Sequence, residues 1–203
     1  MSAEKTSCAS NLRQIYIGVE LFTQQYGSYP NMNATAGSQP SGVWAKKLDG
    51  FLPINEGLPY GGAYDGKSVF ICPARVRQFP DAPEARKAAS YGFSNYFAGI
   101  APWTNKPPVS PINVTHPART ILIADGVWSE SGRYPFQNIQ FDMVPGSIRD
   151  RTSGGGNSAG THGDGAANII YADGHLEWFE DTAQLQDLQY RDWGPRDLWH
   201  VEK

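Results

Sequence analysis

Hydrophobic residues recur at helical spacing near the start of the chain, over residues 4–26. Steps of four and three residues separate Cys8, Leu12, Ile15, Val19, Phe22 and Tyr26, and Tyr16 widens this stripe. That period keeps the set on one side of an α-helix. Polar residues such as Arg13 and Gln24 suit the other side, and Gly27 with Pro30 behind it is a stop signal. We expect a helix about 35 Å long, which needs a packing partner because isolated helices are marginal in water.

Strand patterns are clearest in the second half of the chain. Residues 120–124 (TILIA) are β-branched and apolar, which favours a strand. Residues 167–172 and 175–179 flank Asp173-Gly174, a dipeptide typical of a tight hairpin turn. We therefore predict a β-hairpin that ends near residue 179.

The segments between are weaker in pattern. The apolar run 68–72 (SVFIC), which Pro73 ends, predicts a buried strand, and residues 91–97 predict another. Residues 43–52 carry large apolar residues at helical spacing and predict a short helix. Residues 127–165 mix aromatic residues with turn residues and end in a glycine-rich tract that predicts a surface loop.

These elements predict an α+β fold in one domain, 1–203. The N-terminal helix would pack under an antiparallel sheet built mainly from residues 68–179, with long irregular insertions and a C-terminal extension at 181–203. The composition agrees, because 22 glycines and 15 prolines in 203 residues indicate a loop-rich chain rather than a helical bundle. The sheet needs one face covered, and the helical stripe is the obvious cover.

Charge and cysteine content narrow the function classes. The net charge of −3 and the absence of a basic patch give nucleic-acid binding little support. Cys8 and Cys72 are too far apart in sequence for a common zinc motif, which leaves one disulfide or two buried thiols. Because the helical stripe and the 68–72 strand would face each other, we expect the two cysteines to lie within disulfide reach.

Several polar residues suggest metal chemistry. His162, Asp164, Asp173 and His175 are metal-ligating types, and a metal-dependent hydrolase would use His162, Asp173 and His175. Asp173 also has a structural explanation, since Asp precedes Gly in the turn. A calcium site is a further alternative because loop carboxylates suffice for it. Its candidate ligands are Asp125, Asp142, Asp164 and Asp173.

The six tryptophans suggest a second class of function. Exposed aromatic rings such as those of Trp128 and Trp193 could stack on sugars in a cell-surface carbohydrate-binding module, although most tryptophans are core residues.

Four segments, in order, resemble a family of bacterial pilin-like proteins that carry a prepilin-type N-terminus and a C-terminal H-X9-DG motif. They are the CASNLRQI helix start with its YGSYP exit, the FICP run, the PARTILIADG strand, and the stretch from His162 to His175 that contains Asp173 and Gly174. Ten residues, rather than nine, separate His162 from Asp173.

The resemblance implies a pilin-like fold and a structural, non-enzymatic role. Such proteins look like pseudopilins of type II secretion or type IV pilus-like systems, which assemble through their N-terminal helices and require no cofactor. It also implies that an anchoring segment with a prepilin cleavage site precedes the abrupt start of this sequence. The full-length protein would then be anchored to the inner membrane, with this part outside the cytoplasm and available to a glycan or a secreted-protein cargo.

Overall fold

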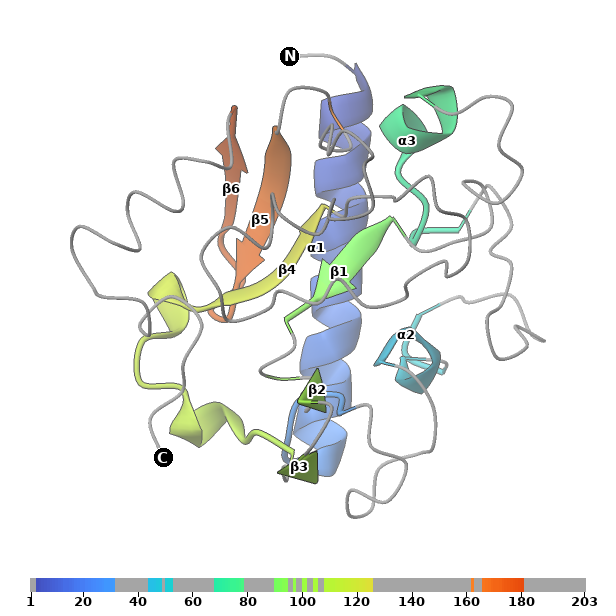
Figure 1. Cartoon of the computed structure of the whole chain (residues 1–203). Coiled ribbons are helices and arrows are strands. Elements are labelled where there is room, and N and C mark those ends of the chain that lie inside the picture. The colour runs from blue at the N-terminus through green and yellow to red at the C-terminus, as the bar shows by residue number, and fades with distance from the viewer. Residues whose placement is uncertain are drawn as a thin grey trace.

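The computed structural model describes residues 3–31, 44–48, 50–52, 68–78, 90–94, 97, 100–101, 104–105, 108–125, 162 and 166–180. In this part of the chain, the long helix α1 (Ala3–Tyr26) lies along one antiparallel sheet of four strands (Figure 1). The α+β class and the predicted pairing of one long helix with an antiparallel sheet are confirmed. Residues 127–161 and the predicted extension 181–203 lie outside the described residues.

The sheet has the strand order β1-β4-β5-β6. Its strands are β1 (Tyr91–Phe93), β4 (Ile121–Asp125), β5 (Ala167–Tyr171) and β6 (Leu176–Phe179). β5 and β6 form the predicted hairpin, and Gly174 in its turn has a φ of 88°, a conformation that glycine adopts without the steric cost of a Cβ. Residues far apart in sequence, from 91 to 179, therefore form one sheet.

One predicted strand is wrong. Residues 68–71 form a turn in which the Ile71 N–H donates to the Ser68 carbonyl at 3.0 Å, and Pro73 then begins the helix α3 (Pro73–Gln78). The Ser68 hydroxyl also accepts the Phe70 N–H, which stabilises the turn. Proline is favoured at a helix start, and a short apolar run does not by itself distinguish a strand from another buried segment.

The remaining described elements are short. The helix predicted within 43–52 is present as α2, and Pro111 and Pro117 each open a single 3-10 turn. The elements are α2 (Trp44–Lys47), β2 (Ile100–Ala101), β3 (Thr104–Asn105), η2 (Pro111–Asn113) and η3 (Pro117–Arg119).

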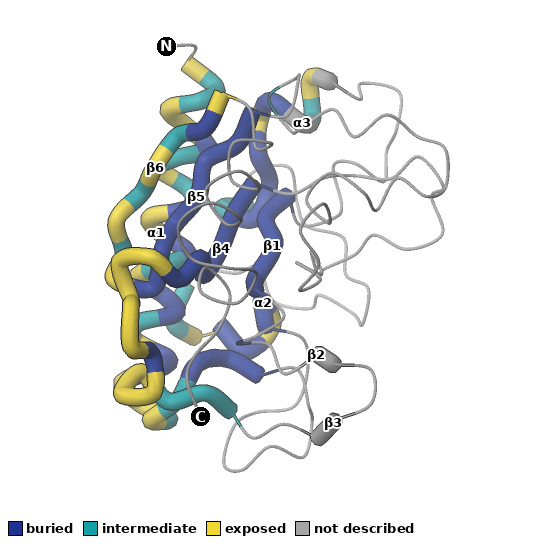
Figure 2. Tube along the Cα trace, turned by 60° about the vertical axis from the view of Figure 1, so that its left-hand side comes forward, coloured by how far each residue is buried: buried dark blue, intermediate teal, exposed yellow. Residues whose placement is uncertain are grey.

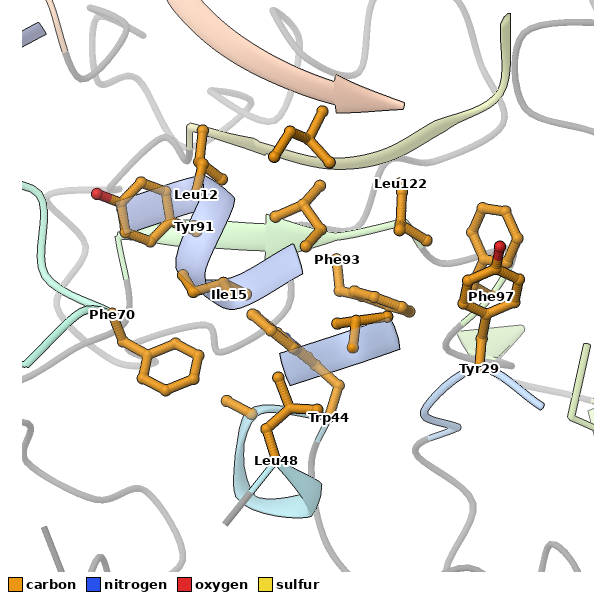
Figure 3. Close-up of a cluster of buried hydrophobic side chains, with 14 of the residues drawn as sticks. Leu12, Ile15, Tyr29, Trp44, Leu48, Phe70, Tyr91, Phe93, Phe97 and Leu122 are labelled. Carbon is orange, nitrogen blue, oxygen red and sulfur yellow. The ribbon is translucent and has the colours of Figure 1, made fainter. Parts of the chain in front are cut away.

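The core lies between α1 and the sheet. The predicted stripe is confirmed, since five of its members are fully buried, namely Cys8, Leu12, Ile15, Val19 and Phe22. From the side of α2, Trp44 stacks on Phe93 of β1 with ring centroids 5.2 Å apart, and its ring meets Phe70 edge-on (Figure 3). Apolar burial of this extent is the main term that holds a helix of marginal intrinsic stability against the sheet.

Burial extends to both faces of the two central strands. Every residue of β4 and of β5 is buried (Figure 2). Ile170 packs in the core under α1, whereas its neighbour Ile169 points to the opposite face and is fully buried as well. The sequence agrees with this result, because ANIIY reads as a nearly continuous apolar run rather than a strict alternation.

Candidate functional site

A buried polar cluster lies on the helix-facing side of the sheet, where β4 ends and β5 begins. It consists of Asp125, Asn168 and His162. Asp125 Oδ2 accepts the backbone N–H of Asn168 at 2.7 Å and its side-chain N–H at 2.8 Å. His162 Nε2 lies 3.0 Å from the same oxygen. The side chains of Asp125 and His162 are only 0% and 5% exposed, so water contributes little to this cluster.

The strands place two of these residues directly. Asp125 is the last residue of β4, and the antiparallel register sets it beside Asn168, one step beyond the Ala124–Ile169 pair. His162, which precedes β5 in the chain, joins them through the contact of its Nε2 atom with Asp125. This contact fixes the imidazole against the sheet.

The cluster adjoins a disulfide between α1 and the segment before α3. Cys8 and Cys72 are bonded, with Cα atoms 5.2 Å apart, and both are fully buried. The expected proximity of the two cysteines is therefore present, although a turn rather than a strand supplies Cys72. Cys72 Sγ lies 3.8 Å from His162 Nε2. The disulfide and the polar cluster thus share His162.

Tyr91 forms the side of the cluster nearest to β1. It is paired with Asp125 in the strand register, and its hydroxyl accepts a hydrogen bond from Asn11 Nδ2 at 3.2 Å. Burial raises the pKa of Tyr91 well above its ordinary value, the negative charge of Asp125 raises this pKa further, and the bond from Asn11 lowers it. The phenol therefore stays neutral at physiological pH. Asn11 also donates to the Ile71 carbonyl at 3.0 Å, which ties α1 to the disulfide-bearing segment.

Trp178 of β6 closes the cluster on the far side. Its ring meets that of His162 edge-on at 5.3 Å, and Lys5 Nζ lies 3.6 Å from the centre of the Trp178 ring. A cation over an indole face is attracted by the ring quadrupole. One face of Trp178 is therefore occupied by a side chain of α1, which reduces the aromatic surface that it could offer to a sugar.

A second polar group lies at the hairpin turn and is more exposed. Asp173 Oδ1 is 2.6 Å from His175 Nδ1, and the His175 ring stacks on Tyr171 at 4.1 Å. The Tyr171 hydroxyl donates to Glu177 at 3.0 Å. Asp173 also accepts the backbone N–H of His175 at 3.1 Å. These contacts explain Asp173 as a residue that stabilises the turn.

The structure does not assemble the proposed hydrolase site of His162, Asp173 and His175. His162 contacts Asn168 at the open end of the β5–β6 hairpin, whereas Asp173 and His175 lie at its turn. The strand from Asn168 to Tyr171 alone spans about 10 Å. The sequence grouped these residues because all three are metal-ligating types, but the extended strand β5 separates them in the fold.

The structure does not bring the described calcium candidates together either. Asp125 and Asp173 lie at opposite ends of the hairpin, and the Asp125 Oδ2 atom is occupied by hydrogen-bond donors. Asp142 and Asp164 lie outside the described residues, as do the proposed sugar-binding Trp128 and Trp193.

The sequence singled out Asp125 and His162 but not Asn168, which contacts both, nor Asn11, which donates to Tyr91 and Ile71. A signal existed for Asn168, because an amide inside the apolar strand ANIIY must find a hydrogen-bond partner when it is buried. Among the described residues only one grouping of cysteine, histidine and carboxylate ligands is compact enough to hold a metal ion, and it consists of Cys8, Cys72 and His162.

As folded, the cluster lacks the arrangement of a nucleophilic triad. Cys72 is oxidised, and both Cys72 and Asp125 lie near the same ring nitrogen of His162. A relay needs the nucleophile on one imidazole nitrogen and the carboxylate on the other. The geometry is instead that of a buried structural contact, in which the His162 imidazole connects the sheet to the disulfide.

No family model, no curated protein and no solved structure matches the chain. Within the described part of the chain, no helix combines the length and the apolarity that a membrane span needs.

Proposed function

We propose that this chain is the extracytoplasmic part of a structural, non-enzymatic, pseudopilin-like subunit. It would belong to a type II secretion or type IV pilus-like system in the cell envelope and be anchored to the inner membrane through a preceding segment. The observation that carries the proposal is the two-sided character of α1. One side is buried under the sheet, and the other side exposes Ile17 and Leu21.

These two side chains form the candidate assembly surface. Ile17 is 55% exposed and Leu21 is 43% exposed, and their spacing of four residues places them in one line along the helix. Fully burying such a side chain contributes about 1.5–3 kcal/mol, so covering these half-exposed groups would contribute roughly 1 kcal/mol each. A contact of that size supports helix-to-helix assembly when it is repeated along a filament.

The disulfide is consistent with the proposed compartment. Disulfides persist in oxidising environments such as the periplasm and the cell surface, and they are rare in the cytosol. The Cys8–Cys72 bond joins the helix to the rest of the domain near the end that would continue into the membrane anchor. It would hold the globular part to the helix during assembly.

The two other functions considered from the sequence are weaker proposals. A metal-dependent hydrolase loses its proposed ligand set, because His162 lies at one end of the β5–β6 hairpin while Asp173 and His175 lie at the other. A carbohydrate-binding module would depend on Trp128 and Trp193, and the described Trp178 has Lys5 over one face.

The test is site-specific photo-crosslinking in cells that express the full-length gene product. A photoreactive amino acid is placed at Ile17 or Leu21, and at Ile112 as the matched control. Ile112 is 90% exposed but lies in η2 rather than in α1. We expect the products from positions 17 and 21 to contain other pilin-like subunits in the membrane fraction, and the product from position 112 to contain none. Equal crosslinking from all three positions, or a product found only in the cytosol, would contradict the proposal.

A further inference from the structure

Three potential metal ligands converge in the buried region between α1 and the sheet. The Sγ atoms of Cys8 and Cys72 and the Nε2 atom of His162 all lie within 4.8 Å of one another. Both cysteines are fully buried, and the side chain of His162 is 5% exposed. In the folded, oxidised chain the two sulfurs are bonded to each other, so neither offers the thiolate that binds a metal.

We propose that the dithiol form of this chain binds one Zn²⁺ through Cys8, Cys72 and His162. The same site would exist before the disulfide forms and after its reduction. The inference stands apart from the proposed assembly role, because it depends only on these side chains.

The chemical step is a thiol–disulfide exchange followed by metal binding. One thiol of a dithiol reductant attacks one sulfur of the Cys8–Cys72 bond and forms a mixed disulfide with the protein. The second thiol of the reductant then attacks this mixed disulfide, which frees the protein as its dithiol form. The protein gains two electrons and two protons, and the reductant becomes a cyclic disulfide. Zn²⁺ then replaces the two thiol protons, which pass to solvent.

The spacing of the ligand atoms fits tetrahedral zinc. Zn–S and Zn–N bonds of about 2.3 and 2.0–2.1 Å place adjacent sulfurs about 3.8 Å apart and a sulfur about 3.5 Å from a nitrogen. The observed distance between Cys72 Sγ and His162 Nε2 is 3.8 Å. After reduction the two sulfurs only need to move apart, and Cα atoms 5.2 Å apart allow this through side-chain rotation.

Asp125 adjoins the three ligand atoms but is not part of the group whose atoms lie within 4.8 Å of one another. Its Oδ2 atom lies 3.0 Å from His162 Nε2 in the oxidised chain, a contact that metal binding at Nε2 would replace. Two hydrogen bonds from Asn168 would keep this carboxylate in place when His162 turns to the metal. The neutral imidazole would bind zinc through the lone pair of Nε2, with the ring hydrogen on Nδ1.

The experiment compares oxidised and reduced protein. The chain is reduced with a dithiol, freed of the reductant without oxygen, and titrated with Co²⁺ and then Zn²⁺ in competition with a chromogenic chelator. We expect the reduced chain to bind one Zn²⁺, to give the absorption of tetrahedral thiolate-bound Co²⁺, and to show a raised Tm. The oxidised chain should bind no stoichiometric metal.

Two histidine variants identify the site. His162→Ala should weaken zinc binding by the reduced chain at least about tenfold. His175→Ala is the matched control, because His175 contacts Asp173 at the hairpin turn, and it should leave the affinity unchanged. Circular dichroism reports whether the reduced chain retains its helix.

Three results would overturn the proposal. The first is a reduced chain that binds no stoichiometric zinc. The second is an affinity that His162→Ala leaves unchanged, which would indicate thiols binding metal without the folded site. The third is a reduced chain that unfolds and does not recover its helical signal when Zn²⁺ is added.

Discussion

Removal of the Cys8–Cys72 disulfide should lower the free energy of unfolding by an amount that depends on the length of the loop that the bond closes. The bond joins residues 64 positions apart. In the chain-entropy model, a loop of that length restricts the unfolded chain enough to contribute about 4 kcal/mol at 25 °C. Both cysteines are fully buried, so alanine is a better replacement than serine, because serine would leave an unpaired hydroxyl in the core.

The informative measurement is a double-mutant cycle. Cys8→Ala and Cys72→Ala each break the same bond, so each should lower the free energy of unfolding by about 4–5 kcal/mol, including a small cavity term. The double variant should lose about 5–6 kcal/mol, far less than the sum of the two. The coupling energy is then about 3–4 kcal/mol, at or above the upper end of the roughly 0.5–3 kcal/mol found for residues in contact.

The assay is urea denaturation followed by circular dichroism, with a chelator present so that metal does not stabilise free thiols. Reduction of the wild-type chain with a dithiol should reproduce the loss, and the same treatment of the double variant should change nothing. Additive single variants, or a coupling energy below about 1 kcal/mol, would refute the reasoning. Either result would mean that the bond does not constrain the unfolded chain.

Three further predictions concern the turn, a buried lysine and the polar cluster. Gly174→Ala should cost about 2–3 kcal/mol in denaturation experiments, because φ is 88° and a Cβ would lie 2.5 Å from Tyr16 Cε1. In a Tyr16→Ala background, Gly174→Ala should cost less, because the clash with Tyr16 is gone, but the cost of the positive φ should remain. A Gly174→Ala variant that costs nothing in this background would contradict the argument from φ. Burial lowers the pKa of Lys47 to about 8 from 10.5, which disfavours the charged form in the folded state. Unfolding therefore takes up protons between those pKa values, and stability should rise by about 2 kcal/mol from pH 7.5 to 9.5. Lys47→Met should remove this slope, whereas a slope that persists in the variant would assign it to other groups. Asp125→Asn should cost about 2 kcal/mol, since the donors of Asn168 lose a charged acceptor, and Asp125→Ala about 3–5 kcal/mol. Losses below 0.5 kcal/mol in both variants would show that the cluster contributes little to stability.

The sequence determined the elements whose pattern is local. The apolar residues of α1 recur every three or four positions, and the burial of Leu12, Val19 and Phe22 follows from this spacing. The β5–β6 hairpin follows from Asp173-Gly174, because few residues other than glycine adopt the required positive φ. β4 follows from its β-branched apolar run. These features depend on neighbours in the chain, so the chain alone is sufficient to predict them.

The tertiary structure decided which distant residues meet. Apolar character alone could not show that residues 68–71 form a turn, because a short apolar run with a buried Phe70 is compatible with a strand or with another buried segment. Residue type grouped His162 with Asp173, whereas the fold brings His162 to Asp125 and Asn168 instead. Register and helix placement are set by the packing of the whole core, and a shift of one residue would turn Asp125 to the opposite face of the sheet. The polar cluster, and the contact of His162 with Cys72, therefore exist only in the folded chain.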